Sequence, residues 1–259
     1  MDTTDSALNV FRDPLVLFFA SLAILWFATW LGATRLRKLR AQVAEHKEDF
    51  GVVQGATLTL LALIIGFTFS MALGRYDQRK DYEEEEANAI GTEYVLVDFL
   101  PEADAANAKH LLRTYLDQRI SFYTTRDREP LEQIAARTAD IQTQLWTAIR
   151  APAAAQPTQL AALVVTGMTT VLNSQGYTQA AWWYRIPVAA WTLMVAIAIC
   201  AMMMVGIGNR DPRSASRILL VFPLVVSIAF FLIADIDSPR HGLIRVHPHN
   251  LESLAQSLH

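Results

Sequence analysis

Four long uncharged stretches divide this chain. Residues 15–34, 50–74 and 186–209 contain no charged residue, and residues 218–234 form a shorter stretch that is equally uncharged. A helix needs about 20 mostly apolar residues, and at least roughly 17, to cross a bilayer. The pattern therefore predicts an all-α integral membrane protein with four transmembrane helices.

The segment between the second and third stretches, residues 75–184, repeats apolar residues at helical spacing and has almost no strand signal. Three or four amphipathic helices fit it. We expect the first to continue the second span as far as Pro101, the third to begin with Pro130 at its first position, and APAAAQP (151–157) to be a linker. The positions expected to be buried in the second, third and fourth helices are Leu112, Tyr115, Leu116, Ile120, Leu131, Ile134, Thr138, Ile141, Leu145, Ile149, Leu160, Leu163, Val164, Met168, Val171 and Leu172.

These patterns divide the chain into five parts. They are a tail over 1–14, a first transmembrane pair over 15–74, a helical extramembrane insert over 75–184, a second transmembrane pair over 185–235, and a tail over 236–259. Lysine and arginine concentrate in the two short loops RLRKLRAQVAEHK and NRDPRSASR. The positive-inside rule then places these loops in the cytoplasm and the insert outside it.

Composition narrows the function classes. The chain has 259 residues, is 53% hydrophobic and only 18% charged, and has a formal net charge of -3. Soluble domains carry about 25% charged residues, so a soluble enzyme is disfavoured. The single cysteine, Cys200, lies in an apolar stretch and cannot form an internal disulfide. The basic residues form no stripe, so the sequence predicts no nucleic-acid partner.

No phosphate loop, dinucleotide fingerprint, nucleophile elbow or two-histidine metal helix occurs in the sequence, which therefore predicts neither an enzyme nor a cofactor. We interpret His247 and His249 as part of a flexible tail rather than a metal site. The carboxylates weighed as acid or base groups are interpreted as solvated or membrane-edge residues; they are Asp104, Asp117, Asp140, Asp235 and Asp237. A membrane-embedded hydrolase has least support, because the spans hold no ionisable group to activate a nucleophile such as Ser21, Ser70 or Ser227.

One face of the second span and its continuation changes character along its length. At about 100° per residue, nine positions fall within an arc of about 80°. We call them the axial stripe: Thr59, Leu63, Phe67, Ser70, Gly74, Asp77, Asp81, Glu85 and Asn88. If several copies surround an axis, they form an apolar neck at Thr59, Leu63 and Phe67. The vestibule beyond this neck is lined by Ser70, Gly74, Asp77, Asp81 and Glu85. From Thr59 to Glu85 the stripe extends over about 39 Å. Apolar necks gate by dewetting, and acidic rings favour cations.

Two other interpretations of this region stay open. Small residues repeat every four positions here, at Gly55 and Thr59 and at Ala62, Gly66 and Ser70. This spacing is also typical of close packing between transmembrane helices. The run DYEEEEAN (81–88) is also typical of a solvated helical face.

Residues 66–79, GFTFSMALGRYDQR, resemble the second transmembrane segment of bestrophins, and the order of two spans, a long helical insert and two more spans is also similar. With EEEEANAIGTEY and DIDSPRHGLIRVHPHNLESL, the chain is similar over most of 51–258 to bacterial bestrophin-like domain proteins. The resemblance implies a homopentameric channel for inorganic ions in the bacterial inner membrane, with Phe67, Leu63 and Thr59 at its neck. It also implies that the insert lies in the cytoplasm, whereas the lysines and arginines of the short loops place it outside. The calcium-binding cluster of animal bestrophins has no counterpart, so we expect no calcium gating.

Two other functions fit the same layout. A membrane sensor would use the insert to bind a ligand, but it would need a partner protein, because both predicted cytoplasmic loops are shorter than about 20 residues. An accessory or scaffold protein would have no transport activity of its own, which agrees with the lack of charge inside the spans.

Overall fold

The computed structural model describes residues 14–38, 46–208 and 216–258, and every regular element among them is a helix. Four segments contain a stretch long and apolar enough to span a membrane: Pro14–Thr34, Lys47–Phe99, Gln159–Gly208 and Leu220–Asp237. The prediction of an all-α protein with four transmembrane helices is confirmed.

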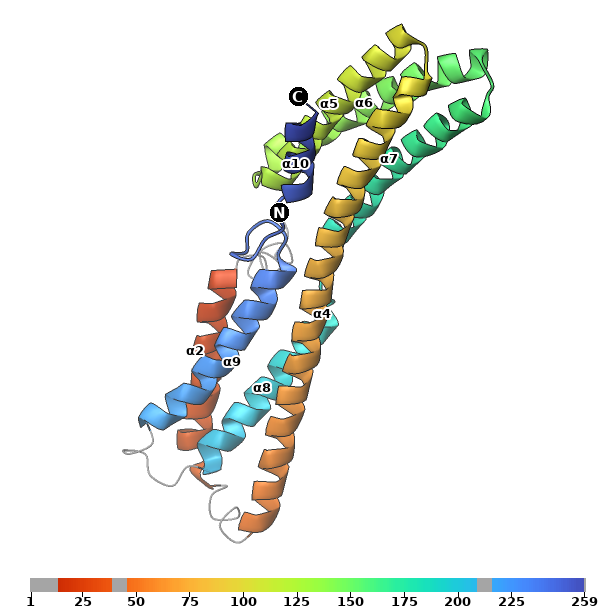
Figure 1. The fold of residues 1–259 in the computed structure, drawn as a ribbon. Helices are drawn as coiled ribbons and strands as arrows, with labels where there is room; N and C mark the ends of the chain where they lie inside the picture. The colour runs from red at the N-terminus through yellow and green to blue at the C-terminus, as the bar shows by residue number, and fades with distance from the viewer. Residues whose placement is uncertain (1–13, 39–45, 209–215, 259) are drawn as a thin grey trace. The chain divides into compact units, whose positions relative to one another are not determined.

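The chain forms two compact units (Figure 1). The membrane unit comprises Met1–Arg75 and Arg185–Arg245, and the insert unit comprises Tyr76–Tyr184 and Val246–His259. Helix α4 (Lys47–Leu96) contributes its first part to the membrane unit and its second part to the insert unit. It continues without a break to Leu96, as expected from the lack of a breaker before Pro101.

In the membrane unit, helix α2 (Pro14–Thr34) packs against both α8 (Val188–Gly208) and α9 (Ser216–Asp237). The crossing of α2 and α8 is close because both helices carry a glycine there. A Cβ atom on Gly32 would overlap the carbonyl oxygen of Met203, and a Cβ on Gly206 would overlap that of Thr29. Small residues at such a crossing let two membrane helices approach backbone to backbone.

The insert unit adds a short 3-10 helix η2 (Val97–Phe99), α5 (Glu102–Thr124), α6 (Arg128–Ala155), α7 (Gln159–Trp183) and α10 (His249–Ser257). Helix α5 packs on α6 and α10, and α6 packs on α7. Their shared core contains most of the apolar positions that the helical spacing predicted, including Leu112, Tyr115, Leu116, Ile141, Leu145, Ile149, Val164, Met168 and Val171. Leu160 and Leu163 were also expected in the core, but they are exposed at the start of α7.

Three further sequence expectations differ from the structure. The linker expected over 151–157 is mostly helical, because α6 runs to Ala155 and only Gln156–Thr158 connect it to α7. Alanine is the strongest helix former, and four of the five residues from 151 to 155 are alanine. Helix α6 begins at Arg128, so Pro130 is its third residue rather than its first; a proline is still tolerated there, because the amide groups of a first turn have no partner within the helix.

The third difference concerns the carboxyl-terminal residues. The sequence placed a tail over 236–259 and interpreted His247 and His249 as part of a flexible segment, whereas α9 extends to Asp237 and residues His249–Ser257 form α10. Leu251 of α10 is fully buried in the core of the insert unit. The apolar spacing of this short helix was too brief to be recognised in the sequence.

Candidate functional site

The membrane part of the axial stripe is uncovered in the single chain. Thr59, Leu63, Phe67, Ser70 and Gly74 are all exposed, and Leu63 and Phe67 have 51% and 65% of their surface accessible. The hydroxyl of Thr59 donates to the carbonyl oxygen of Gly55 at 2.9 Å, so its polar atom already has a partner within the helix. The stripe therefore presents an apolar surface over this part of α4.

The insert part of the axial stripe is also uncovered. Asp77, Asp81, Glu85 and Asn88 are exposed, and all four belong to the insert unit. Carboxylates at these positions are open to solvent or to an ion. Along one face of α4, the exposed surface thus changes from apolar to acidic, as the spacing predicted.

The opposite side of α4 is buried. The residues with less than a tenth of their surface exposed include Leu61, Thr68, Ala72, Arg79, Glu83, Glu86, Ile90 and Glu93. At about 100° per residue, their mean direction lies roughly 160° from the centre of the axial stripe. Packing within one chain therefore occupies the far side of α4 and leaves the axial stripe free.

The run of four glutamates divides between these two sides. Glu84 and Glu85 are exposed, whereas Glu83 and Glu86 are buried. The sequence favoured a solvated face for the whole run. The signal that could have separated them is the series 79, 83, 86, 90, 93 and 97, which repeats at three- and four-residue spacing through apolar and charged residues alike.

Glu86 is the centre of a buried polar network. Its carboxylate forms a salt bridge with Arg119 of α5, and its Oε2 accepts from the Nη2 of Arg119 at 3.3 Å, the hydroxyl of Thr178 at 3.2 Å and the hydroxyl of Tyr123 at 3.4 Å. Burial acts to lower the pKa of Arg119, but the charge of Glu86, the neighbouring Tyr115 and Tyr123 and the hydrogen bond to Glu86 together outweigh burial and keep that pKa above its ordinary value. Burial, followed by the charge of Glu86, raises the pKa of Tyr115 and Tyr123 above their ordinary values. The network joins α4, α5 and α7 through one carboxylate.

Glu83 holds the carboxyl-terminal helix. Its Oε1 accepts from the backbone amides of Asn250 and Leu251, both at 3.0 Å, and its Oε2 accepts from the Asn250 side chain at 2.7 Å. These amides lie in the first turn of α10, where they have no partner within the helix. A glutamate 167 residues away in the chain therefore caps α10.

The two aspartates at the end of α9 also have structural partners. Asp235 accepts from the amides of Leu243 and Ile244 at 2.7 and 2.9 Å, and Asp237 accepts from the amide of Ile186 at 3.0 Å. They hold the loop after α9 and the residues before α8. The sequence interpreted these carboxylates as membrane-edge markers and did not show these roles.

The other weighed residues form no cluster. Asp104 and Asp117 lie on α5 and Asp140 lies on α6, and the last two are exposed. The rings of His247 and His249 stack with centroids 5.7 Å apart. Within the described parts of the chain, no group of three or more His, Cys, Asp or Glu side chains could hold a metal ion.

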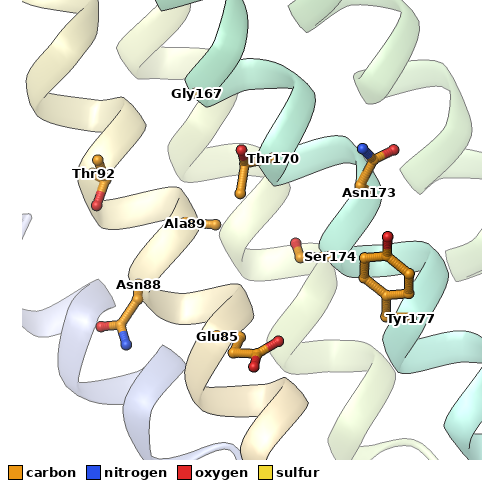
Figure 2. Close-up of a pocket in the computed structure, with 9 residues that line it drawn as sticks. All are labelled: Glu85, Asn88, Ala89, Thr92, Gly167, Thr170, Asn173, Ser174 and Tyr177. Atoms are coloured by element: carbon orange, nitrogen blue, oxygen red, sulfur yellow. The ribbon is translucent and has the colours of Figure 1, made fainter. Parts of the chain in front are cut away.

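A groove of about 570 Å³ lies between α4 and α7 in the insert unit (Figure 2). Figure 2 shows Glu85, Asn88, Ala89 and Thr92 on one wall and Gly167, Thr170, Asn173, Ser174 and Tyr177 on the other. Hydroxyl and amide groups predominate, and Glu85 is the one carboxylate that lines it. Because Glu85 and Asn88 belong to the axial stripe, the groove adjoins the acidic part of that surface.

These features define an all-helical membrane protein with an uncovered helix face that runs from apolar to acidic. The family model of the Bestrophin-like domain matches residues 19–251, and the chain belongs to this family. The fold is similar to that of a bacterial bestrophin homologue from Klebsiella pneumoniae, with a TM-score of 0.63, 12% identity, and coverage of 93% of this chain and 96% of that chain. Two variants of the Klebsiella protein match with TM-scores of 0.64 and 0.61, at 12% and 13% identity, covering 93% of this chain and 97% of theirs. No curated protein matches this sequence.

Proposed function

We propose that this protein is an oligomeric channel through which ions pass passively, with several copies of α4 around a common axis. Thr59, Leu63 and Phe67 form the neck, and Ser70, Gly74, Asp77, Asp81 and Glu85 line the vestibule. The carboxylates of the vestibule favour cations over anions.

The observation that carries this proposal is the division of α4 into a packed side and a free side. The axial stripe is exposed over its whole length, although the opposite side of the same helix is buried in the chain. A face that only met lipid would have no use for Asp77, Asp81 and Glu85 in register with Leu63 and Phe67. A narrow apolar ring followed by acidic rings is what a gated, cation-attracting path needs.

The family supports the same assignment. Bestrophins, which this sequence resembles, are ion channels, and Phe67, Leu63 and Thr59 match their neck positions. The position match and the helical spacing select the same three residues by separate routes. By the same resemblance, we propose a homopentamer in the inner membrane of a bacterium, embedded in the lipid bilayer.

Orientation in the membrane is the part of the proposal on which charge and family differ. The lysines and arginines of the two short loops favour an insert outside the cytoplasm, and the resemblance implies an insert inside it. We retain the orientation from the charge count. A protease added to spheroplasts, whose outer membrane has been opened, would cut the insert if that orientation holds.

The test of conduction is ion flux into liposomes that contain the purified protein, using a matched pair of aromatic variants. Phe67→Ala removes a ring from the neck, and we expect flux to rise several-fold because the constriction widens. Phe69→Ala removes a ring from the same helix, but Phe69 points about 160° away from Phe67 and lies off the axial stripe, and we expect no change. The reversal potential in a salt gradient reports the cation preference of both.

A closed oligomer with no flux in the wild type or in Phe67→Ala would contradict the proposal. Equal increases in Phe67→Ala and Phe69→Ala would also contradict it, because the effect would not then depend on the axial stripe.

A further inference from the structure

Glu93 is a buried carboxyl that the channel proposal does not use. It lies on the part of α4 that belongs to the insert unit, and none of its surface is exposed. Neither of its carboxyl oxygens has a hydrogen-bond partner among the described residues. Buried polar groups in folded proteins nearly always have a partner, so this one requires a physical explanation.

Helix α7 packs directly against this carboxyl. A Cβ atom on Gly167 would overlap the Oε2 of Glu93 and would also crowd the Leu96 side chain. Glycine therefore leaves the space that the carboxyl fills. We call this contact between Glu93 and Gly167 the α4–α7 seam.

No opposite charge faces Glu93 from the elements around it. Helix α7 contains no Asp, Glu, Lys, Arg or His. On α4, Glu86 lies two turns earlier and is paired with Arg119. Several charged groups of the neighbouring elements have partners of their own: Asp98 of η2 pairs with Lys109, Lys109 and Arg113 of α5 lie over the ring of Tyr94, and His249 and Glu252 of α10 lie 3.8 Å apart.

We propose that Glu93 makes the α4–α7 seam proton-sensitive: its neutral carboxyl lets the two helices pack, and loss of the proton separates them. An isolated carboxylate in this position would have to give up its hydration without gaining a partner, which is costly. Separation of the helices lets water reach the charged group and removes that cost.

The direction of the pH effect follows from burial. Burial raises the pKa of Glu93 from 4.5 to about 8. In the separated state, water reaches the carboxyl and its pKa returns toward 4.5. Between pH 4.5 and about pH 8 the packed state holds more protons than the separated state. The preference for the packed state is therefore strongest below about pH 4.5 and weakens as the pH rises. Above about pH 8 this preference changes no further. Over this range, each pH unit shifts the ratio of separated to packed helices about tenfold.

Infrared difference spectroscopy of the full chain in detergent tests the protonation directly. We expect the C=O stretching band of a protonated carboxyl at neutral pH, and we expect it to be lost with a midpoint above neutral pH but below about pH 8, because separation of the helices favours the charged form. The band should be absent in Glu93→Gln and unchanged in Glu84→Gln, which removes an exposed glutamate from the same helix. A wild-type chain without the band at neutral pH, or a Glu93→Gln chain that retains it, would overturn the proposal.

A second variant tests the geometry. Gly167→Ala should push the carboxyl toward water, so the midpoint of the band should fall toward pH 4.5. The proposal fails if that midpoint stays at the value measured for the wild type.

Hydrogen exchange of the α7 amides around Gly167 tests the separation of the helices. Wild type and Glu93→Gln are compared at the same pH, so that the intrinsic exchange rates cancel. We expect equal exchange near pH 4.5 and faster exchange in the wild type near pH 8. A ratio that does not change with pH would show that the proton does not control the seam. Neither readout needs ion flux. This proposal can therefore fail while the channel proposal stands, and the channel proposal can fail while this one stands.

Discussion

The salt bridge between Glu86 and Arg119 is the most consequential pair of residues in the insert unit. Both side chains are almost completely buried, and the carboxylate also accepts from Thr178 and Tyr123. A buried ion pair adds little net stability over a well-packed apolar pair, but removal of one partner leaves the other charge buried and unpaired. The pair and its neighbours link α4, α5 and α7, so loss of either charge would leave the other buried between these helices.

Replacement of Arg119 by methionine should destabilise the insert unit by about 3–5 kcal/mol, because Glu86 would be left buried and unpaired. Denaturant unfolding in detergent, followed by circular dichroism, measures the loss. The double variant Glu86→Leu with Arg119→Met should recover most of it, since no charge is then stranded. Equal destabilisation in the single and double variants would show that the network is not the cause.

The burial of some single residues could be predicted from the sequence, and the burial of others could not. The spacing of apolar residues predicted the buried faces of α5 and α6, because burial of apolar side chains follows helical periodicity directly. It did not separate Glu83, Glu86 and Glu93 from the exposed glutamates, because a charged residue is solvated by default. Their burial depends on partners or contacts far away in the chain, such as Arg119, Asn250 and Gly167, and one sequence does not reveal those pairings.

At the scale of elements, α10 is the segment that the sequence described least well. It is only nine residues long, and an isolated helix of that length is marginal in water. Its stability comes from Leu251 in the core and from the cap that Glu83 supplies. The helix is therefore a docked part of the insert unit and depends on α4.

Replacement of Glu83 by alanine should loosen α10 by about 1–3 kcal/mol, because three hydrogen bonds to a charged acceptor are lost. Carboxypeptidase digestion of the full chain measures this, and we expect faster trimming of the last residues. Glu84→Ala is the matched control, since Glu84 is the adjacent glutamate and is exposed. Identical trimming of the two variants would contradict the capping role.

The linker expected over 151–157 is a second element that the sequence predicted wrongly, because most of it is helical. Alanine and proline together resemble a spacer in composition, yet most of this segment continues α6. Proline is tolerated in the last turn, where its missing amide removes one hydrogen bond, and the adjacent alanines favour the helix. Composition alone could not decide between the two.

For the whole molecule, the axial stripe is what connects fold to function. Its positions were predicted from spacing, and the structure leaves all of them exposed. Their role in a pore remains a proposal, because several copies of the chain are needed to form one. The two open alternatives, a sensor and a scaffold, place no demand on a stripe that changes from apolar to acidic.

The central claim is that the axial stripe faces a path for ions. The most direct test is thiol block of ion flux in liposomes, in a chain whose own Cys200 is replaced by alanine. Leu63→Cys places a thiol at the proposed neck, and Phe69→Cys places one at a side chain that is 38% exposed but lies off the stripe. We predict that a charged, membrane-impermeant thiol reagent stops flux through Leu63→Cys and leaves flux through Phe69→Cys unchanged. Unblocked flux through Leu63→Cys after confirmed labelling, or equal block of both variants, would contradict the account.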